Sequence, residues 1–151
     1  MIKGPRGVEL IQGETFTLAA SAARTATAGT NGTAVYFGGE RKRFIVLLNT
    51  TNCDTEGTDT LDVYLDWSFD DSTYYNGAHF TQRVGTDAAT KEYAIFDTTT
   101  PGAVVIDVTS DANSGVTRPQ VFGPYMRARW VIVDGGGTAA SFTFSVTGWA
   151  E

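Results

Sequence analysis

The stretch TLDVYLDWSFDDSTYYNGAHFTQ, residues 60–82, decides the fold class of this chain. Every second residue of its first half is apolar: Leu61, Val63, Leu65, Trp67 and Phe69. Because strand side chains alternate between two faces, this pattern predicts a long strand with one buried and one solvated face. Asp70-Asp71-Ser72 favours a turn, since short polar side chains bond back to nearby amides. The aromatic run that follows predicts the return strand of a hairpin, Tyr74–Gln82.

Two features interrupt the return strand. Asn76-Gly77 lies inside it, and a glycine within a strand indicates a β-bulge. His79 is the sole histidine of the chain, with no second histidine and no neighbouring cysteine. We therefore expect His79 to make an ordinary hydrogen bond and not to bind a metal.

The rest of the chain repeats the pattern of short apolar runs between turn residues. Further strands are predicted at Thr15–Ala19, Thr33–Phe37, Lys42–Thr50, Lys91–Phe96, Ala103–Val108, Tyr125–Asp134 and Ser141–Ala150. No window shows the apolar repeat of a helix. About eight core strands with irregular reversals predict an all-β chain folded as an antiparallel β-sandwich, jelly-roll-like in kind.

The domain organisation predicted from composition is an arm followed by a sandwich. Residues 1–30 are interpreted as an extended N-terminal arm and linker, and residues 31–151 as the β-sandwich domain. Within the first part, Ala19–Gly32 is rich in Ala and Thr and is interpreted as a linker into the first core strand.

Two apolar features predict contacts beyond the core. The glycine-rich N-terminal segment contains Ile2, Val8, Leu10 and Ile11, which favour an arm docked along the domain edge or on a neighbour. Lys42–Thr50 is apolar on both faces, so its inner face is expected to meet a second sheet. Its outer face is expected to meet the arm or a partner, or alternatively the chain's own loops.

Charge and composition restrict the partners. The chain has 11 basic and 17 acidic residues, net charge −6, and an acidic chain is a poor generic binder of nucleic acid. No apolar run approaches the roughly 20 residues that span a bilayer, so no membrane partner is expected. The first residues lack the apolar region of a secretory signal, which predicts use without Sec export. Cys53 is the only cysteine, so no internal disulfide can form, and we expect an incidental loop thiol.

No motif for nucleophilic, zinc-dependent or phosphate-binding chemistry occurs, and we expect neither an enzyme nor a cofactor. The acids Asp62, Asp66, Asp70 and Asp71 match no calcium loop and are expected on a solvated face, opposite Arg127 and Arg129. A structural calcium would best fit the loops that contain Asp54, Glu56 and Asp59. A carboxylate pair for glycoside hydrolysis lacks the apolar pocket that would raise a pKa.

Aromatic side chains outside the inward register point to a binding surface. Tyr64 and Trp149 are predicted on outward faces, and Tyr74 and Tyr75 cannot both point inward. Exposed aromatics either stack on sugars or fill protein interfaces. Together with the apolar arm they favour assembly. The predicted interface is therefore Ile2, Val8, Leu10, Ile11, Tyr64 and Trp149.

Four segments, in order, resemble a group of small virion proteins of tailed bacteriophages and prophages: ASAARTATAGT, TLDVYLDWSFDDSTYYNGAHFTQ, MRARWVIVD and ASFTFSVTGWA. In that group the middle segment reads as LDV, a turn of the S-x-D-G kind, an aromatic residue and FTQ. The usual turn glycine is absent here, and Asp71-Ser72 stands in its place.

The resemblance implies a jelly-roll cement or decoration protein on the capsid surface of a virion, made in the host cytoplasm. Its implied partner is the major capsid protein, and it implies a homo-oligomer, for which we expect a trimer. The resemblance transfers no functional residues. Two alternatives remain: a carbohydrate-binding module of a tail fibre or baseplate that stacks sugars on its outward aromatics, and a head–tail connector or neck protein.

Overall fold

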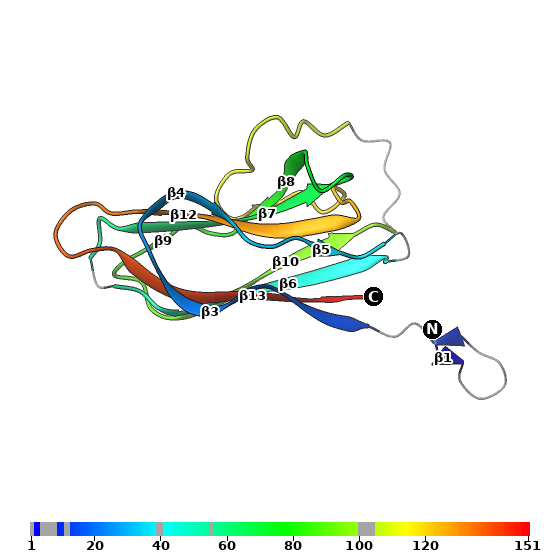
Figure 1. Cartoon of the computed structure of the whole chain (residues 1–151), viewed down its shortest axis with the longest axis horizontal. Coiled ribbons are helices and arrows are strands. Elements are labelled where there is room, and N and C mark those ends of the chain that lie inside the picture. Colours follow the sequence, from blue (N-terminus) through cyan, green and yellow to red (C-terminus); the bar gives the residue numbers. More distant parts are fainter. Residues whose placement is uncertain (1, 4–8, 11–12, 39–40, 55, 100–104) are drawn as a thin grey trace.

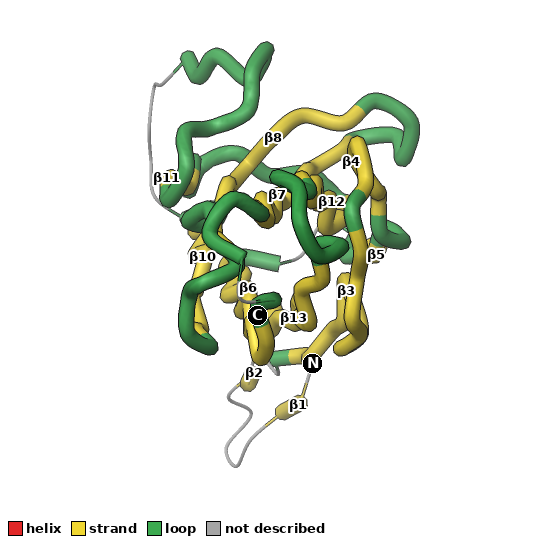
Figure 2. The backbone as a smooth tube through the Cα atoms, turned by 90° about the vertical axis from the view of Figure 1, so that its left-hand side faces the viewer, coloured by secondary structure: helices red, strands yellow, loops and turns green. Residues whose placement is uncertain are grey.

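Two antiparallel sheets packed face to face form the body of the protein (Figures 1 and 2). The computed structural model describes residues 2–3, 9–10, 13–38, 41–54, 56–99 and 105–151, and these contain strands and no helix. The all-β antiparallel sandwich predicted from the sequence is therefore confirmed.

The first sheet has four strands in the order β10-β6-β13-β3. Its members are β3 (Glu14–Thr25), β6 (Arg43–Asn52), β10 (Thr90–Asp97) and β13 (Ser141–Ala150). In β6 the residues Phe44, Val46 and Leu48 are buried and alternate with half-buried residues, as expected for a sheet with one face on the core.

The second sheet has seven strands and follows the order β11-β8-β7-β12-β4. These are β4 (Thr27–Asn31), β7 (Thr60–Ser68), β8 (Tyr74–His79), β11 (Val116–Thr117) and β12 (Tyr125–Val133). The short strands β5 (Val35–Tyr36) and β9 (Arg83–Val84) pair with β12 and β7. Separately, β1 (Ile2–Lys3) pairs with β2 (Glu9–Leu10) beyond one end of the sandwich (Figure 1).

The pairing of the eight long strands is nested. The first, β3, pairs with the last, β13; β4 pairs with β12, β6 with β10, and β7 with β8. Two further pairings, β6 with β13 and β7 with β12, join these four pairs into two sheets. Such wrapping of one long hairpin into two sheets is the jelly-roll topology, and the sequence expectation is confirmed.

The hairpin β7–β8 forms as its sequence predicts. The amides of Ser72 and Thr73 donate to Asp70 Oδ1 at 2.9 and 2.8 Å, and Asp71 takes a positive φ of 58° to close the turn. Leu65 lies opposite Ala78 whereas Asp66 lies opposite Asn76, so Gly77 is the extra residue of a bulge.

Trp67 lies at the centre of the core and is fully buried. Its ring packs edge-on against Phe44 and Phe96, with centroids 5.0 and 5.1 Å away, which joins side chains of both sheets. A Cβ atom on Gly77 would lie 2.5 Å from Trp67 Cδ1. Glycine, which has no Cβ atom, is therefore the residue type that leaves room for the indole ring at this position of the bulge.

The boundary between arm and sandwich lies earlier than predicted. Ala19–Gly32 was interpreted as a linker, but β3 and β4 occupy most of it and pair with β13 and β12. The sandwich thus begins at Glu14 and not at residue 31. Apolar and polar residues alternate only weakly in this Ala- and Thr-rich stretch, so its sequence does not predict strands. The strands form because β13 and β12 lie beside it and pair with it.

Three predicted strands differ in extent. Residues 105–108 of the predicted strand Ala103–Val108 are not in a strand; Val105 is fully exposed, and Ile106 and Val108 pack on the core from a loop. Thr33–Phe37 shortens to β5, and the return strand ends at His79. The neighbouring strands do continue alongside two of these segments: the Gly32 amide donates to the Ala128 carbonyl of β12 at 2.8 Å, and the Phe80 amide donates to the Val63 carbonyl of β7 at 3.0 Å.

We predict that Gly77→Ala lowers the free energy of unfolding by about 1–3 kcal/mol, because the added Cβ overlaps the Trp67 ring and forces the core to shift. Urea denaturation followed by tryptophan fluorescence measures this. Gly57→Ala is the matched control, since its Cβ would meet only the Thr86 side chain at 3.5 Å. Equal stability of the two variants would contradict this account of the bulge.

Candidate functional site

The two outward aromatics predicted for the interface lie on opposite faces of the molecule. Trp149 pairs with Ile45 and lies on the outer face of the four-stranded sheet. Tyr64 alternates with the buried residues of β7 and lies on the outer face of the seven-stranded sheet. The two residues therefore do not belong to one continuous surface.

The outer face of the four-stranded sheet has an apolar patch built from two rows of residues across the strands. In one row Tyr93 lies opposite Leu47 and Leu47 opposite Thr147; in the other Ile95 lies opposite Ile45 and Ile45 opposite Trp149. We call the five apolar residues the outer patch: Ile45, Leu47, Tyr93, Ile95 and Trp149. Tyr93 is 68% exposed and Ile95 50% exposed. A groove of about 260 Å³ runs along these rows.

Polar residues border the outer patch at both ends of the strands. On one side the next row is Lys91, Asn49 and Ser145. On the other side Arg43 lies opposite Asp97 and forms an ion pair with Glu151. A contiguous apolar surface inside a polar border is the usual form of a protein contact site.

The N-terminal arm begins at the edge of the outer patch. A Cβ atom on Gly13 would lie 2.0 Å from the Trp149 ring, so the chain passes directly against the indole before entering β3. Ile2 lies opposite Leu10 in the β1–β2 pair. Val8 and Ile11, also predicted for the interface, lie outside the described residues.

Two aromatic rings on the seven-stranded face, those of Tyr64 and Tyr74, each lie against an arginine. Tyr64 is stacked on His79, with centroids 4.2 Å apart, and the Arg129 guanidinium lies 4.1 Å from the Tyr64 centroid. Arg127 lies 3.6 Å from the centroid of Tyr74. Because a sugar needs a free aromatic face, these rings are poor stacking platforms.

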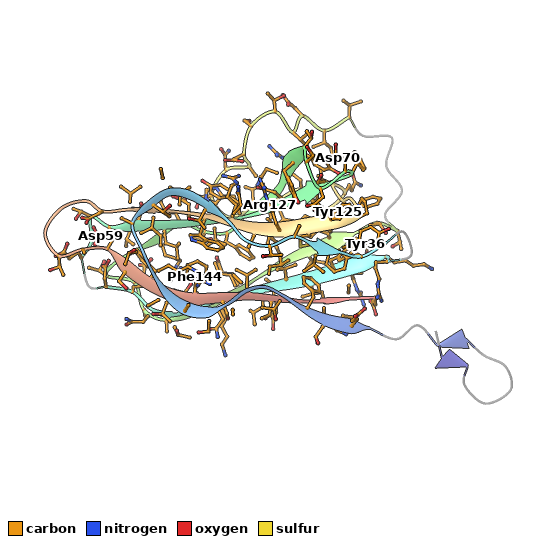
Figure 3. The ribbon with its side chains drawn as sticks, in the orientation of Figure 1. Tyr36, Asp59, Asp70, Tyr125, Arg127 and Phe144 are labelled. Carbon is orange, nitrogen blue, oxygen red and sulfur yellow. The ribbon has the colours of Figure 1, made fainter. Side chains whose placement is uncertain are left out.

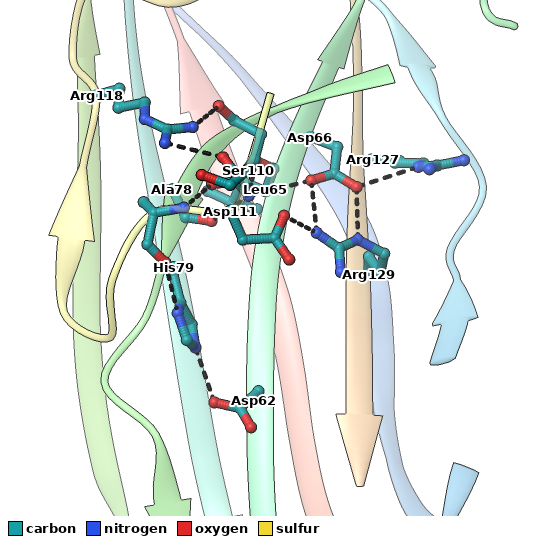
Figure 4. A network of polar contacts seen from close by, with 12 residues as sticks. Asp62, Leu65, Asp66, Ala78, His79, Ser110, Asp111, Arg118, Arg127 and Arg129 are labelled. Atoms are coloured by element: carbon teal, nitrogen blue, oxygen red, sulfur yellow. Dashed lines mark hydrogen bonds and ion pairs between the residues drawn. The ribbon is translucent and has the colours of Figure 1, made fainter. Parts of the chain in front are cut away.

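An ion network holds the centre of the same face (Figure 4). Asp66 is 3% exposed and accepts from Arg129 Nε at 2.8 Å, and Arg127 Nε lies 3.6 Å from its carboxylate. Arg129 Nη2 also donates to Asp111 at 2.6 Å. The predicted pairing of the strand acids with the two arginines is confirmed for Asp66, but this carboxylate is buried and not solvated.

The network fastens the loop of residues 105–123 onto the sheet. The Ala112 amide donates to Asn76 Oδ1 at 2.9 Å, and Arg118 donates to the carbonyls of Asn76 and Ser110 at 3.0 and 2.9 Å. Asn76 Nδ2 donates in turn to Asp66 Oδ1 at 3.1 Å. The loop rises above the sheet in Figure 1. Besides these side-chain bonds, it is joined to the sheet by the pairing of β11 with β8 and by the Arg118 amide, which donates to the Gly77 carbonyl at 2.8 Å.

His79 makes two hydrogen bonds, both to oxygen acceptors. Its Nδ1 lies 3.0 Å from the Ala112 carbonyl and its Nε2 lies 2.8 Å from Asp62 Oδ1. A carbonyl and an ionised carboxylate only accept, so both ring nitrogens carry protons when both bonds form. Burial works to lower the pKa of His79, but the bonds to Asp62 and Ala112 outweigh it and raise the pKa. The predicted hydrogen-bonding role of His79 is confirmed.

At one end of the sandwich, carboxylates in the loops accept hydrogen bonds from backbone amides (Figure 3 labels Asp59). Asp54 accepts from the amides of Glu56 and Ser141, at 3.0 and 2.9 Å, and Asp59 accepts from Gly135 at 2.7 Å. The Gly135 bond works to lower the pKa of Asp59, but burial and the neighbouring Asp54 raise it. Within the described ranges, no three His, Cys, Asp or Glu side chains are grouped to bind a metal ion.

Cys53 is buried and free. Burial raises the pKa of its thiol, and the acids Asp54 and Asp87 act in the same direction. A raised pKa leaves little thiolate at neutral pH, so Cys53 is a poor nucleophile.

Sequence reasoning missed the contribution of β10 to the outer patch. In KEYAIF, Tyr93 and Ile95 alternate with the buried Ala94 and Phe96, so both faces of the strand are apolar. The same double pattern was recognised in β6, which pairs with β10. The role of Asn76 and Arg118 in holding the loop carried no signal, because Asn76 lies 36 residues from Ala112 and 42 residues from Arg118.

Comparison with known proteins gives two distant structural likenesses. No protein-family model matches the chain, and no curated protein sequence matches it. One solved structure, of the infectious bursal disease virus Gx strain, has a TM-score of 0.49 at 15% identity and covers 92% of this chain. Another, of the Gt strain of that virus, has a TM-score of 0.45 at 11% identity and covers 99%.

The chain spans only about a third of the length of these two matched chains, 32% and 35%. At identities below 25% and TM-scores below 0.5, these likenesses support no conclusion about function. The jelly-roll topology is assigned from the strand pairing alone. Among the residues that the structure describes, no helix is long and apolar enough to cross a membrane.

We predict that Asp66→Ala lowers the free energy of unfolding by about 3–5 kcal/mol, because it leaves two partly buried arginines without their shared anion. Hydrogen exchange should rise in the loop of residues 105–123 at the same time. Glu14→Gln is the control: Glu14 pairs with Arg41 at the exposed surface, and such pairs are worth about 0–1 kcal/mol. Unchanged exchange of the loop in Asp66→Ala would contradict its anchoring by the network.

We predict that the stabilising effect of His79 depends on pH. Its pKa is higher in the folded chain than the ordinary value near 6.5, so its contribution is complete below that value. The contribution is lost as the pH rises through the raised folded pKa. Unfolding free energies of the wild type and His79→Gln, measured from pH 5 to pH 9, should converge at high pH. A difference that stays constant with pH would show that the His79 charge is not involved.

Proposed function

We propose that this chain is a structural protein of a virion, a decoration or cement protein that binds over junctions between major capsid subunits of a tailed-bacteriophage head. It stabilises the head by non-covalent contacts and catalyses no reaction. The observation that carries the proposal is the outer patch, in which five apolar side chains lie together on the outside of a rigid jelly-roll sheet. Apolar surface of this kind gains free energy when a partner covers it.

Three further observations support the proposal. The buried acids and His79 are engaged in loop anchoring, and the described residues hold no grouped metal ligands. The residue patterns of the hairpin and of the last two strands resemble those of small phage virion proteins. The acidic net charge of −6 suits a shell exterior that faces solvent and lies away from DNA.

The covered rings of Tyr64 and Tyr74 favour this function over the carbohydrate-binding alternative. Many symmetric copies on a shell make each weak contact effective, because binding at several sites at once raises the overall affinity. A modest patch is therefore sufficient for a cement protein.

The test is loading of the purified chain onto expanded heads that lack it, measured by co-sedimentation and by a density map of the particle. We expect saturable binding at every equivalent junction. A single ring at the portal vertex would indicate a connector, and binding to a glycan array without binding to heads would indicate a sugar-binding module. Either result would overturn the proposal.

We predict that Leu47→Asp weakens loading about tenfold or more, because a carboxylate in the centre of the outer patch loses its hydration when the patch is covered, a cost above about 1.4 kcal/mol. Ser145→Asp is the matched control, on the same sheet face but in the polar row beside the patch. Circular dichroism verifies that both variants fold. Equal loading by the two variants would exclude the outer patch from assembly.

A further inference from the structure

Two loops that cross between the sheets meet at one end of the sandwich, on the left in Figure 1. One joins β6 to β7, and the other joins β12 to β13. They touch directly, because a Cβ atom on Gly135 would lie 2.4 Å from the Thr58 carbonyl oxygen. Since each loop connects one sheet to the other, contacts between the two loops close this end of the sandwich.

Three carboxyl groups of the first loop accept hydrogen bonds from backbone amides of the second. We call them the carboxyl cluster: Asp54, Glu56 and Asp59. Their donors, at 2.9, 2.6 and 2.7 Å, are the amides of Ser141, Thr138 and Gly135. None of the ion pairs among the described residues includes a member of the cluster. The cluster is therefore stabilised by backbone dipoles and not by counter-ions.

Asp59 is the fully buried member of the cluster, with 0% of its surface exposed. Its Oδ1 accepts from Gly135, but its Oδ2 is buried without a donor. Its carboxyl group lies within hydrogen-bonding reach of that of Asp54. A buried, ionised oxygen without a donor is costly, whereas a protonated oxygen can donate to the neighbouring carboxylate.

The charges that face this pair also favour one proton. Asp134, in the second loop, acts on Asp59 as a further negative charge. In the neighbouring strand β9, Arg83 pairs with Asp87 and with neither member of the pair.

The two carboxyl groups titrate in opposite directions from their ordinary values. The Gly135 bond works to lower the pKa of Asp59, but burial and Asp54 raise it. Burial works to raise the pKa of Asp54, but the amides of Glu56 and Ser141 outweigh it and lower the pKa. Opposite shifts in two adjacent carboxyl groups are the behaviour of a pair that holds one proton.

We propose that Asp54 and Asp59 share one proton and form a pH-sensitive contact that closes this end of the sandwich. Asp59 Oδ2 carries the proton and donates it to Asp54. When the pH rises, the proton passes to solvent and two carboxylates face each other without a cation between them. Their repulsion loosens the contact between the two loops. The inference goes beyond the proposed function and does not depend on binding to a capsid.

Cys53 reports on the opening of this end. It precedes Asp54, is 7% exposed and is the only cysteine of the chain. A thiol reagent therefore reaches it when the loops separate. The labelling rate of the urea-unfolded chain divided by that of the folded chain, at the same pH, gives a protection factor. This ratio removes the titration of the thiol itself.

The experiment compares the wild type with two variants from pH 4 to pH 8. Asp59→Asn keeps the shape of the side chain, and its amide group donates to Asp54 at every pH. Glu56→Gln is the matched control, because it neutralises the neighbouring member of the cluster and can still accept from Thr138. Circular dichroism verifies that both variants fold.

We predict that protection of Cys53 in the wild type falls as the pH rises and becomes constant above the folded pKa of Asp59. The contact is complete below the ordinary aspartate pKa and is lost as the pH rises through the raised folded value, with a limiting slope of about tenfold per pH unit for one proton. Glu56→Gln should follow the wild type, whereas Asp59→Asn should stay protected throughout. Any effect of His79 acts on all three chains alike.

A second measurement needs no variant. Carboxyl carbon chemical shifts of the wild type, followed against pH, should show Asp59 titrating above the ordinary aspartate value of about 3.9 and Asp54 below it. Titration of both groups at the ordinary value would contradict a shared proton.

Three labelling results would overturn the inference. Equal pH profiles of the wild type and Asp59→Asn would show that Asp59 does not control the opening. A profile that is abolished in Glu56→Gln and kept in Asp59→Asn would place the proton on Glu56. Protection restored by calcium chloride at pH 8 would show that the cluster holds a cation in place of a proton. None of these results bears on loading onto heads, so the proposed function is tested separately.

Discussion

The structure depends on the packing of Trp67 against a strand that lacks a side chain at Gly77. The ring fills the space between the sheets and contacts Phe44 and Phe96, which lie opposite each other on the facing sheet. The bulge that positions Gly77 also sets the register of β8, because the extra residue brings Asn76 opposite Asp66. One steric requirement in the core thereby determines which polar groups meet on the outside.

The outer faces of the two sheets carry different side chains, although residues alternate between inner and outer positions in both sheets. On the seven-stranded face, Asp66, Arg129 and His79 occupy the outward positions and are used to hold a loop that has little strand pairing of its own. On the four-stranded face, the outward positions of β6, β10 and β13 are apolar around Leu47. The polar groups around Asp66 on the first face are paired within the chain, whereas Tyr93 and Ile95 on the second face remain at least half exposed.

Much of the fold could be predicted from alternation, because long strands with one buried face leave a clear period of two. The hairpin around Asp70 and the strand Tyr125–Asp134 are examples. Ala19–Gly32 could not be placed, since its small side chains carry no period and its two strands form only because β13 and β12 lie beside them. The site was predicted in part: Trp149 was identified as outward, but its grouping with Tyr93 required the register between β10 and β6.

The nested pairing has a consequence for how the chain is made. Strand β3 is made early in synthesis, but its partner β13 is the last strand to be made. The backbone groups of β3 therefore remain unpaired for most of synthesis, and unpaired strands are prone to aggregate or to pair with the wrong strand. The small, weakly hydrophobic residues of Ala19–Ala23 suit this delay, because they offer little for a premature contact to hold.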